Sequence, residues 1–357
     1  MDDKVKSILK ALLFAAIGGV VLWLVYRSNN AAYQEECLQK GIAAADCNLL
    51  DKVITDVKSA NYLWIIVSLI LFTLSNISRA LRWHIMLEPL GYKPRFFNSL
   101  SAILVAYLSN LGLPRSGEFV RAGILSKYEG YPVDKLMGTI LIDRITDVIM
   151  LLVVIALAIV LSYERFYGYL SENINLTGSG GGLLTPLNIG ILAIVGFTGL
   201  FLLSKYKSRI AATKIGGKIF GLIHGLKEGL LSVTKLRQPG LFVFHTLFIW
   251  FCYFAMTYVV FFAFEPTAHL GPVAGLVIFV FGTLGIVFPS PGGMGSYHYL
   301  VGEGLALYGI EQGDAFSFAN IIFFSVQLFC NVLLGLIALV LLPIYNDSRA
   351  KQDELVQ

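Results

Sequence analysis

Residues 98–113 read NSLSAILVAYLSNLGL, an apolar stretch of 16 residues that runs directly into Pro114-Arg115-Ser116-Gly117. A second stretch, residues 273–289, reads VAGLVIFVFGTLGIVFP and is followed by Ser290-Pro291-Gly292-Gly293. Both are shorter than the roughly 20 apolar residues that a membrane-spanning helix needs. Each places a proline three residues before a glycine, and the two prolines are 175 residues apart. The chain therefore carries a weak internal repeat of two short apolar runs, each ended by a proline–glycine break.

Such a break is costly at membrane depth. Proline removes a backbone donor and glycine permits unusual backbone angles, so carbonyl and amide groups lose their helical partners. Irregular backbone is tolerated there only where protein or water satisfies it. Short, interrupted hydrophobic segments at matching positions of two halves point to the central site of a transporter. The alternative is that the two breaks are ordinary turns at the membrane edge.

The composition excludes most other classes of protein. Hydrophobic residues make up 56% of the 357 residues, charged residues only 14%, and the mean hydropathy is +0.73. A soluble domain is about 25% charged, and a nucleic-acid-binding domain needs clustered surface cations. Long continuous apolar runs also argue against the alternating segments of a membrane β-barrel. We therefore expect an all-α, polytopic integral membrane protein.

Six apolar runs are long enough, or nearly so, to span a bilayer. They are residues 8–27, 61–81, 139–162, 187–204, 241–263 and 316–342. Together with two short re-entrant or broken helical hairpins they form a single transmembrane domain, residues 1–357, that we expect to be an inverted pseudo-repeat. Residues 297–310 either complete the second hairpin or span the bilayer.

Lysine and arginine define the sidedness, because cytoplasmic loops carry an excess of them. With the N-terminus inside, the cytoplasmic segments hold 20 cations and the outside segments four. We therefore expect both termini in the cytoplasm and a bacterial inner-membrane location. Residues 205–240, with eight cations, are predicted to form a basic cytoplasmic segment with an amphipathic helix. That segment either contacts lipid headgroups or only sets the topology.

The 28–60 loop is then outside and holds Cys37 and Cys47. An oxidising compartment permits a local disulfide between them. The alternative is two free thiols. A bridge here would staple the loop without creating a site.

Several charged residues lie in or beside the apolar runs, where an ionised group costs roughly 2.5–3.5 kcal/mol or more. Arg79 and Arg82 end the second run, either on the transport path or as interfacial anchors beside Trp83. Near the first break we predict a buried ionic cluster, since two stacked carboxylates require a cation or a proton between them. Its members are Glu118, Arg121, Asp143, Arg144 and Asp147. This cluster is either a binding site for a zwitterionic or anionic headgroup or a set of salt bridges that only holds the helices together. If one carboxylate is protonated, headgroup binding is linked to a proton.

The second break is followed by Tyr297, His298, Tyr299 and Glu303. His298 is either an ordinary hydrogen-bonded residue or a group on the transport path. The chain contains no metalloprotease, nucleophile-elbow or phosphate-loop motif. We therefore expect no catalytic residue, no metal and no cofactor.

Three blocks of residues carry a resemblance to a known family. They are Arg79-x-x-Arg82-Trp83, then Asn110 through Gly117-Glu118-x-x-Arg121 to Asp143-Arg144-x-x-Asp147, and finally Pro289-x-Pro291-Gly292-Gly293-Met294-Gly295. The chain resembles the lysylphosphatidylglycerol-synthase transmembrane-region family, also called flippase-like. The resemblance implies two re-entrant helices and the movement of polar lipids between leaflets. It is similar to the membrane half of the multiple peptide resistance factor without the soluble synthase domain, so lipid aminoacylation is not implied. The family often has glutamate at His298 and at Asp143.

We therefore expect a lipid flippase that moves a polar or charged lipid, with a phosphate or polyprenyl-linked headgroup, between leaflets. The alternatives are a non-transporting scaffold that regulates a lipid-modifying enzyme, and an intramembrane lipid-modifying enzyme that uses His298 or Glu303. Candidate partners are membrane lipids, a lipid-modifying enzyme and a second copy of the chain; nucleic acid is not expected. The residues assigned to the path are Arg79, Arg82, Asn110, Pro114, Arg115, Gly117, Glu118, Arg121, Asp143, Arg144, Asp147, Pro289, Pro291, Gly292, Gly293, Gly295 and His298.

Overall fold

The computed structural model describes residues 23–35, 37–43, 47–113, 116–165, 236–287 and 293–356. Within these ranges the secondary structure is helical and no strand is present. Contacts divide the chain into two compact units, residues 1–144 with 236–357 and residues 145–235. The single transmembrane domain expected over residues 1–357 stays a prediction. Most of the features that follow lie in the first unit, and the helix Val133–Leu161 begins in the first unit and ends in the second.

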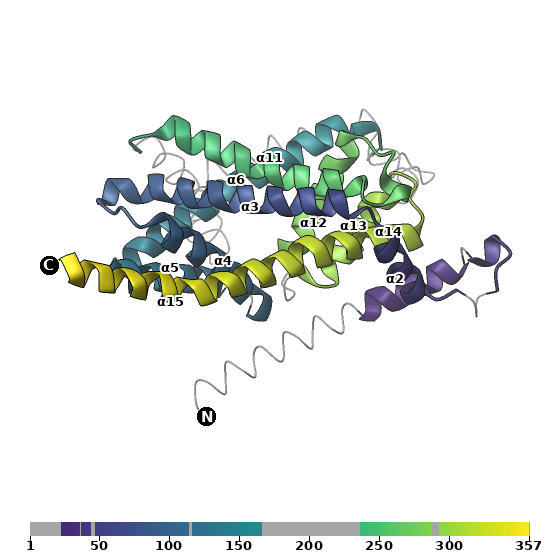
Figure 1. Cartoon of the computed structure of the whole chain (residues 1–357). Coiled ribbons are helices and arrows are strands. Elements are labelled where there is room, and N and C mark those ends of the chain that lie inside the picture. The colour runs from purple at the N-terminus through teal and green to yellow at the C-terminus, as the bar shows by residue number, and fades with distance from the viewer. Residues whose placement is uncertain are drawn as a thin grey trace, which may run out of the picture. The chain divides into compact units, whose positions relative to one another are not determined.

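Four helical stretches of the described chain are long and apolar enough to cross a membrane (Figure 1). They are Tyr62–Leu90, Val133–Leu161, Pro239–Phe261 and Gln312–Ser348. The first joins α3 (Tyr62–Leu87) to the 3-10 turn Glu88–Leu90, while the second is α6 (Val133–Leu161) and the third α11 (Pro239–Phe261). The fourth runs from α14 (Gln312–Ile322) through a π-helical stretch (Phe323–Cys330) into α15 (Asn331–Val356). These four correspond to the predicted runs 61–81, 139–162, 241–263 and 316–342, which confirms the all-α polytopic fold.

The other two predicted spans lie wholly or mostly outside the described residues. Residues 187–204 lie wholly outside the described residues. Of residues 8–27, only 23–27 are described, as part of a helical segment that continues to residue 35. Most of the predicted basic segment, residues 205–240, also lies outside them.

The segment before α3 packs onto α14. Cys37 and Cys47 form a disulfide, and the Asn30 side chain accepts a 3.1 Å hydrogen bond from the backbone amide of Leu49, the first residue of α2 (Leu49–Ser59). Lys52 of α2 then forms a 2.6 Å ion pair with Asp314 of α14. The bridge therefore staples a loop that is itself tied to the helical core.

Helices α3 and α11 run antiparallel, side by side. Asn61, which caps α3, donates its backbone amide to the Ala263 carbonyl just past α11, at 2.8 Å. Farther along, the Ser68 hydroxyl donates to the Met256 carbonyl at 3.3 Å, and Ser78 lies 2.8 Å from the His245 ring. The beginning of α3 therefore lies beside the end of α11. The end of α3 correspondingly lies beside the beginning of α11, so these helix ends mark the two ends of the helix pair.

The first short run forms a helical hairpin made of α4 (Phe96–Gly112) and α5 (Gly117–Glu129). With 17 residues, α4 is about 25 Å long, less than the roughly 30 Å of a bilayer core. The base of the hairpin is closed, because Arg95 donates to the Glu129 carboxylate at 3.0 Å and Tyr92 stacks on Tyr131. The chain therefore enters and leaves at the same end, the end where α3 finishes.

The second short run forms the matching hairpin, α12 (Pro272–Val287) and α13 (Ser296–Ala306). The 11 residues of α13 extend only about 16 Å, so residues 297–310 do not span a bilayer. Near the base, α13 lies so close to α12 that a Cβ on Gly304 would sit 2.9 Å from Ile278. This hairpin opens where α11 finishes and α3 begins, opposite to the first.

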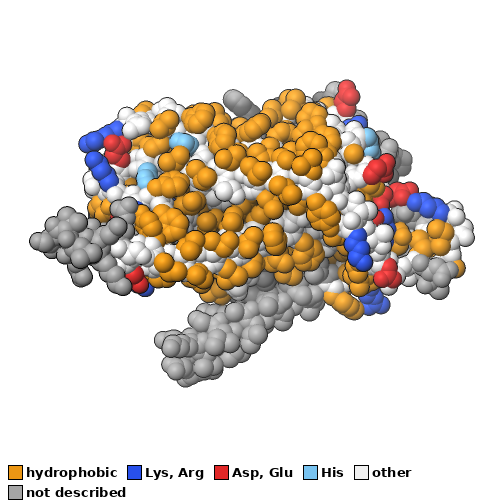
Figure 2. Space-filling view, viewed as in Figure 1, with side chains coloured by type: hydrophobic (Ala, Val, Ile, Leu, Met, Phe, Trp, Pro, Cys, Tyr) orange, Lys and Arg blue, Asp and Glu red, His pale blue; other side chains and the backbone are white. Residues whose placement is uncertain are grey.

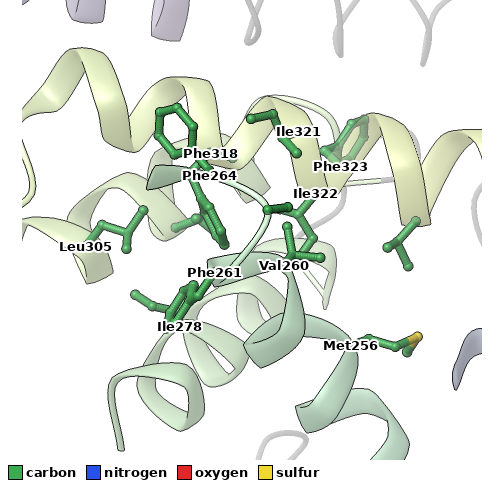
Figure 3. Close-up of a cluster of buried hydrophobic side chains, with 14 of the residues drawn as sticks. Met256, Val260, Phe261, Phe264, Ile278, Leu305, Phe318, Ile321, Ile322 and Phe323 are labelled. Carbon is green, nitrogen blue, oxygen red and sulfur yellow. The ribbon is translucent and has the colours of Figure 1, made fainter. Parts of the chain in front are cut away.

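A hydrophobic core holds the second hairpin in place (Figure 3). Phe261 of α11 lies 5.2 Å from Phe318 of α14, measured between ring centroids, and both side chains are fully buried. Ile278 of α12 and Leu305 of α13 belong to the same cluster. Burial of each such side chain contributes about 1.5–3 kcal/mol to the free energy of folding. This cluster therefore holds the second hairpin, and with it the second break, against α11 and α14.

The outer surface of the long helices is apolar. Leu63, Ile66 and Ile70 of α3 and Phe244 and Phe251 of α11 are exposed. Figure 2 shows hydrophobic side chains over the middle of this face and charged ones toward its two ends. An apolar belt between charged ends is what a lipid bilayer requires.

Candidate functional site

A single buried carboxylate, Asp143 of α6, is surrounded by three arginines. One oxygen, Oδ2, accepts from Arg79 Nη1 at 3.0 Å and from Arg121 Nη1 at 2.9 Å. The other, Oδ1, accepts from Arg82 Nη2 at 2.5 Å. The Asp143 side chain has no exposed surface, and the three arginine side chains are at most 4% exposed. We call these four residues the arginine cluster.

The cluster is assembled by three helices. Arg79 and Arg82 are three residues apart on α3, so they share one face of that helix. Arg121 comes from α5, the returning arm of the first hairpin, and Asp143 from α6. The first hairpin is therefore tied to the long helices through its own charged residue.

Polar and aromatic groups hold the arginines in place. The Tyr253 hydroxyl accepts from Arg79 Nη2 at 2.9 Å, and the Thr246 hydroxyl oxygen accepts from Arg82 Nη1 at 3.2 Å. The guanidinium carbon of Arg121 lies 3.8 Å from the centre of the Trp83 ring, a close cation–π contact. Arginine suits a buried aromatic site because its planar, weakly hydrated guanidinium stacks on aromatic rings and forms paired hydrogen bonds with oxyanions.

The cluster is rich in guanidinium groups, because three of them share the Asp143 carboxylate. In a nearby pair, Arg144 Nε lies 2.8 Å from the Glu118 carboxylate. Within the part of the chain that the structure describes, the buried Nε and Nη2 atoms of Arg121 have no hydrogen-bond partner. Buried guanidinium N–H groups that lack a hydrogen-bond partner favour an oxyanion such as a phosphate.

The predicted site residues separate into three groups. Arg121 and Asp143 meet directly, whereas Glu118 and Arg144 form a separate, half-exposed pair, and Asp147 belongs to the second unit. Arg79 and Arg82 join the cluster. The alternative that they anchor at the membrane interface with Trp83 is wrong, because all three side chains are buried.

The polar residues of the first break support its backbone. The Asn110 side-chain oxygen accepts from the backbone amide of Gly117 at 2.8 Å and so caps the returning helix. A Cβ on Gly117 would collide with the Ala106 carbonyl, so only glycine fits. Pro114 and Arg115 lie outside the described residues.

The second break is described in part. Pro289, Pro291 and Gly292 lie outside the described residues. Gly293 and Gly295 have φ angles of 81° and 84°, which favour glycine. The Ser296 hydroxyl donates to the Gly285 carbonyl at 2.7 Å and so closes this tip. His298 is buried among aromatic rings, with Phe323 4.7 Å away, and has no charged residue among its ring contacts.

Sequence reasoning missed the contribution of α11. Thr246 and Tyr253 are two polar residues seven apart in an apolar run, which puts them on one helical face. That spacing was a usable signal for the face that meets the arginines. No group of three metal-ligating side chains occurs in the residues that the structure describes.

The fold and site define a class: a polytopic helical membrane protein with two opposed helical hairpins and a buried arginine cluster. The family model described as "Lysylphosphatidylglycerol synthase TM region" matches residues 48–350, and the chain belongs to that family. It is similar to UPF0104 membrane protein MJ1595 of Methanocaldococcus jannaschii, with 31% identity over 101 residues. That match covers 28% of this chain and 30% of the relative. No solved structure matches the chain significantly.

Proposed function

We propose that this protein is a lipid flippase that moves a lipid with a phosphate-bearing or otherwise polar headgroup between the leaflets of a bacterial inner membrane. The carrying observation is Arg121 of the buried arginine cluster. It lies on the arm of a hairpin that does not cross the bilayer, and its Nε and Nη2 atoms have no hydrogen-bond partner in the described chain. The family description, which refers to the membrane region of a lipid synthase, agrees with a lipid as the cargo.

The proposed orientation follows from the distribution of cations. The end of the unit where α3 finishes faces the cytoplasm, and the end with the disulfide faces outward. The first hairpin then opens to the cytoplasm and the second to the outside. Two interrupted hairpins that open toward opposite leaflets are the arrangement in which transporters hold their central site.

In this mechanism the phosphate replaces part of the hydrogen bonding of the cluster. Arg121 presents Nε and Nη2 to the oxyanion while Nη1 keeps its bond to Asp143. Asp143 holds the three guanidinium groups together while the site is empty of lipid, which limits their mutual repulsion. The site residues bind and release; none forms or breaks a covalent bond.

The experiment is leaflet exchange in proteoliposomes, with fluorescent phosphatidylglycerol and chemical quenching of the outer leaflet. We expect Arg121→Ala and Asp147→Asn to reduce the rate of exchange at least tenfold while the protein still folds. Lys127→Ala is the matched control, because it removes an exposed cation from the same helix. Wild-type exchange rates in the Arg121→Ala protein would contradict the role of the cluster.

A second candidate function is a scaffold that regulates a lipid-modifying enzyme. The complete burial of Asp143 favours it, since a buried ion cluster can also serve as a helix lock. This function predicts co-purification of an enzyme from native membranes and no exchange by the isolated protein. Lipid mass spectrometry of a deletion strain distinguishes the flippase and the scaffold from an intramembrane lipid-modifying enzyme. Only the loss of an enzyme would remove a lipid product from the membrane.

A further inference from the structure

The structure contains a second polar site, away from the arginine cluster. A cavity of about 230 Å³ lies where helix α13 meets α14 and the helical segment 23–35. Six polar residues line it: Ser28, Asn29, His298, Tyr299, Glu303 and Gln312. The remaining lining residues are small or aliphatic, among them Gly302 and Ala306. The cavity therefore has a mixed lining of polar and apolar side chains.

His298 is the unusual member of this lining. Only 1% of its surface is exposed, and neither ring nitrogen has a hydrogen-bond partner of good geometry in the described chain. The Asn320 side chain lies within hydrogen-bonding reach of the ring; its amide donates to the Phe316 carbonyl at 2.7 Å, which leaves its oxygen to accept from one ring N–H. The other ring nitrogen is an acceptor without a partner in the described chain. A buried polar group left unsatisfied costs about 1–3 kcal/mol, which a hydroxyl donor would recover.

The chemistry of the lining selects the occupant. No lysine or arginine lines the cavity, so nothing in it attracts a phosphate as the arginine cluster does. The hydroxyls of Ser28 and Tyr299, the amides of Asn29 and Gln312 and the imidazole of His298 all offer both a donor and an acceptor, and the Glu303 carboxylate accepts. Hydroxyl groups, which also donate and accept, are the natural complement. The volume is below the 300–1,000 Å³ typical of drug-sized ligands and suits one small ring or headgroup.

We propose that the His298 cavity is a binding site for an uncharged, hydroxyl-rich group of about the size of one hexose. Such a group is either a lipid headgroup or a free polyol. The site goes beyond the proposed flippase activity, because binding here does not require lipid movement. It would give the two hairpins different ligands, an oxyanion for the first and hydroxyls for the second.

The test uses the full chain in mild detergent and native mass spectrometry. The probes are dioleoylglycerol bearing one glucose, plain dioleoylglycerol, and dioleoylphosphatidate, which has a phosphate and no headgroup hydroxyl. We expect wild-type protein to retain the glucosyl lipid at least fivefold better than plain dioleoylglycerol. His298→Ala and Gly302→Leu should each remove this preference while leaving phosphatidate retention unchanged.

The variants have matched controls. Gly302→Leu keeps every polar group, and a Cβ there meets no atom within 4 Å, so its side chain fills the cavity rather than the helix packing. Gly123→Leu makes the same change at an equally open glycine on α5, and His269→Ala removes an exposed histidine. Thermal unfolding of each variant checks that the fold is retained.

The outcomes separate the sources and the failures. Competition by free glucose assigns the site to a soluble polyol, whereas its absence assigns the site to a lipid headgroup; both support hydroxyl recognition. The proposal is overturned if the glucosyl lipid is retained no better than dioleoylglycerol. It is also overturned if Gly302→Leu leaves the preference intact. Neither result bears on leaflet exchange, which Arg121→Ala tests separately.

Discussion

The two helical hairpins have the same backbone plan and opposite chemistry. Both have a first arm of 16 or 17 residues, and both close their tip with a glycine packed against backbone and a polar side chain on a backbone group. The returning arm of the first hairpin presents Arg121 to a carboxylate and two further arginines. The returning arm of the second presents His298 to aromatic rings and to a cavity that no lysine or arginine lines. The difference teaches that the same backbone plan can carry different side-chain chemistry, because the break depends on proline and glycine whereas the chemistry depends on the returning arm.

The largest expected effect comes from removing the charge that organises the first hairpin. Asp143→Asn leaves three buried guanidinium groups without their shared carboxylate, and loss of one partner of a buried ion pair costs about 3–5 kcal/mol. We expect a marked drop in thermal stability in detergent. Glu118→Gln is the control, because its pair with Arg144 is partly exposed and should contribute about 1 kcal/mol or less. Equal stability of the two variants would show that Asp143 is not the centre of the cluster.

The next test asks whether the two tips are equivalent. Gly117→Ala would press a methyl group against the Ala106 carbonyl, and Gly285→Ala would place one 2.6 Å from the Tyr297 Cα atom. Overpacking of this kind costs about 1–3 kcal/mol, and backbone atoms give way little. We expect both variants to unfold at lower temperature than wild type.

The controls for the tips are two glycines with open space around them. Gly123→Ala on α5 and Gly302→Ala on α13 meet no atom within 4 Å. Since alanine is the better helix former by about 0.8–1 kcal/mol, these variants should match or exceed wild-type stability. Destabilisation by Gly117→Ala alone would break the comparison and show that only the first tip is tightly closed.

A smaller effect of opposite sign is expected at the second hairpin. His298→Leu removes a buried ring that lacks a well-formed hydrogen bond and leaves an apolar side chain among Phe316 and Phe323. Relief of an unsatisfied polar group should raise the free energy of unfolding by about 1 kcal/mol. Calorimetry in detergent measures this. A loss of several kcal/mol would mean that the ring is bonded in the folded protein.

The smallest effect concerns the contact that ties α2 to α14 beside the second hairpin. Burial lowers the pKa of Lys52, but the hydrogen bonds that its amine donates to Asp314 and Asp56, with the attraction of those carboxylates, outweigh burial, and the pKa is raised above 10.5 overall. The ion pairs therefore stabilise the fold from neutral pH up to about pH 10.5 and lose that effect as the pH rises through the raised pKa. Near neutral pH, Lys52→Met should lower stability by about 1 kcal/mol or less.

The pH dependence provides the check on this contact. Unfolding temperatures of wild type and Lys52→Met, measured from pH 7 to above 11, should differ up to about pH 10.5 and converge above it. Lys58→Met, which changes an exposed lysine on the same helix, should show no such convergence. A constant difference across the range would mean that the amine is not what stabilises the contact.

Much of this protein was determined by local sequence. A bilayer has a nearly fixed thickness, so the number of apolar residues in a run decides whether its helix can cross. The four described spans and the two shorter runs could therefore be told apart by counting residues. Proline and glycine act on their own backbone, so the positions of both breaks were also readable.

Only the tertiary structure decided which charges meet. Arg79 and Arg82 could equally have reached the membrane interface, because a long side chain can turn either way and its choice depends on the neighbouring helix. The α6 carboxylate and the Tyr253 hydroxyl draw them inward, and both lie more than 60 residues away in sequence. His298 is similar, since its cavity is formed with residues from the opposite end of the chain. Contacts between distant segments depend on packing, and a pattern along the chain does not contain them.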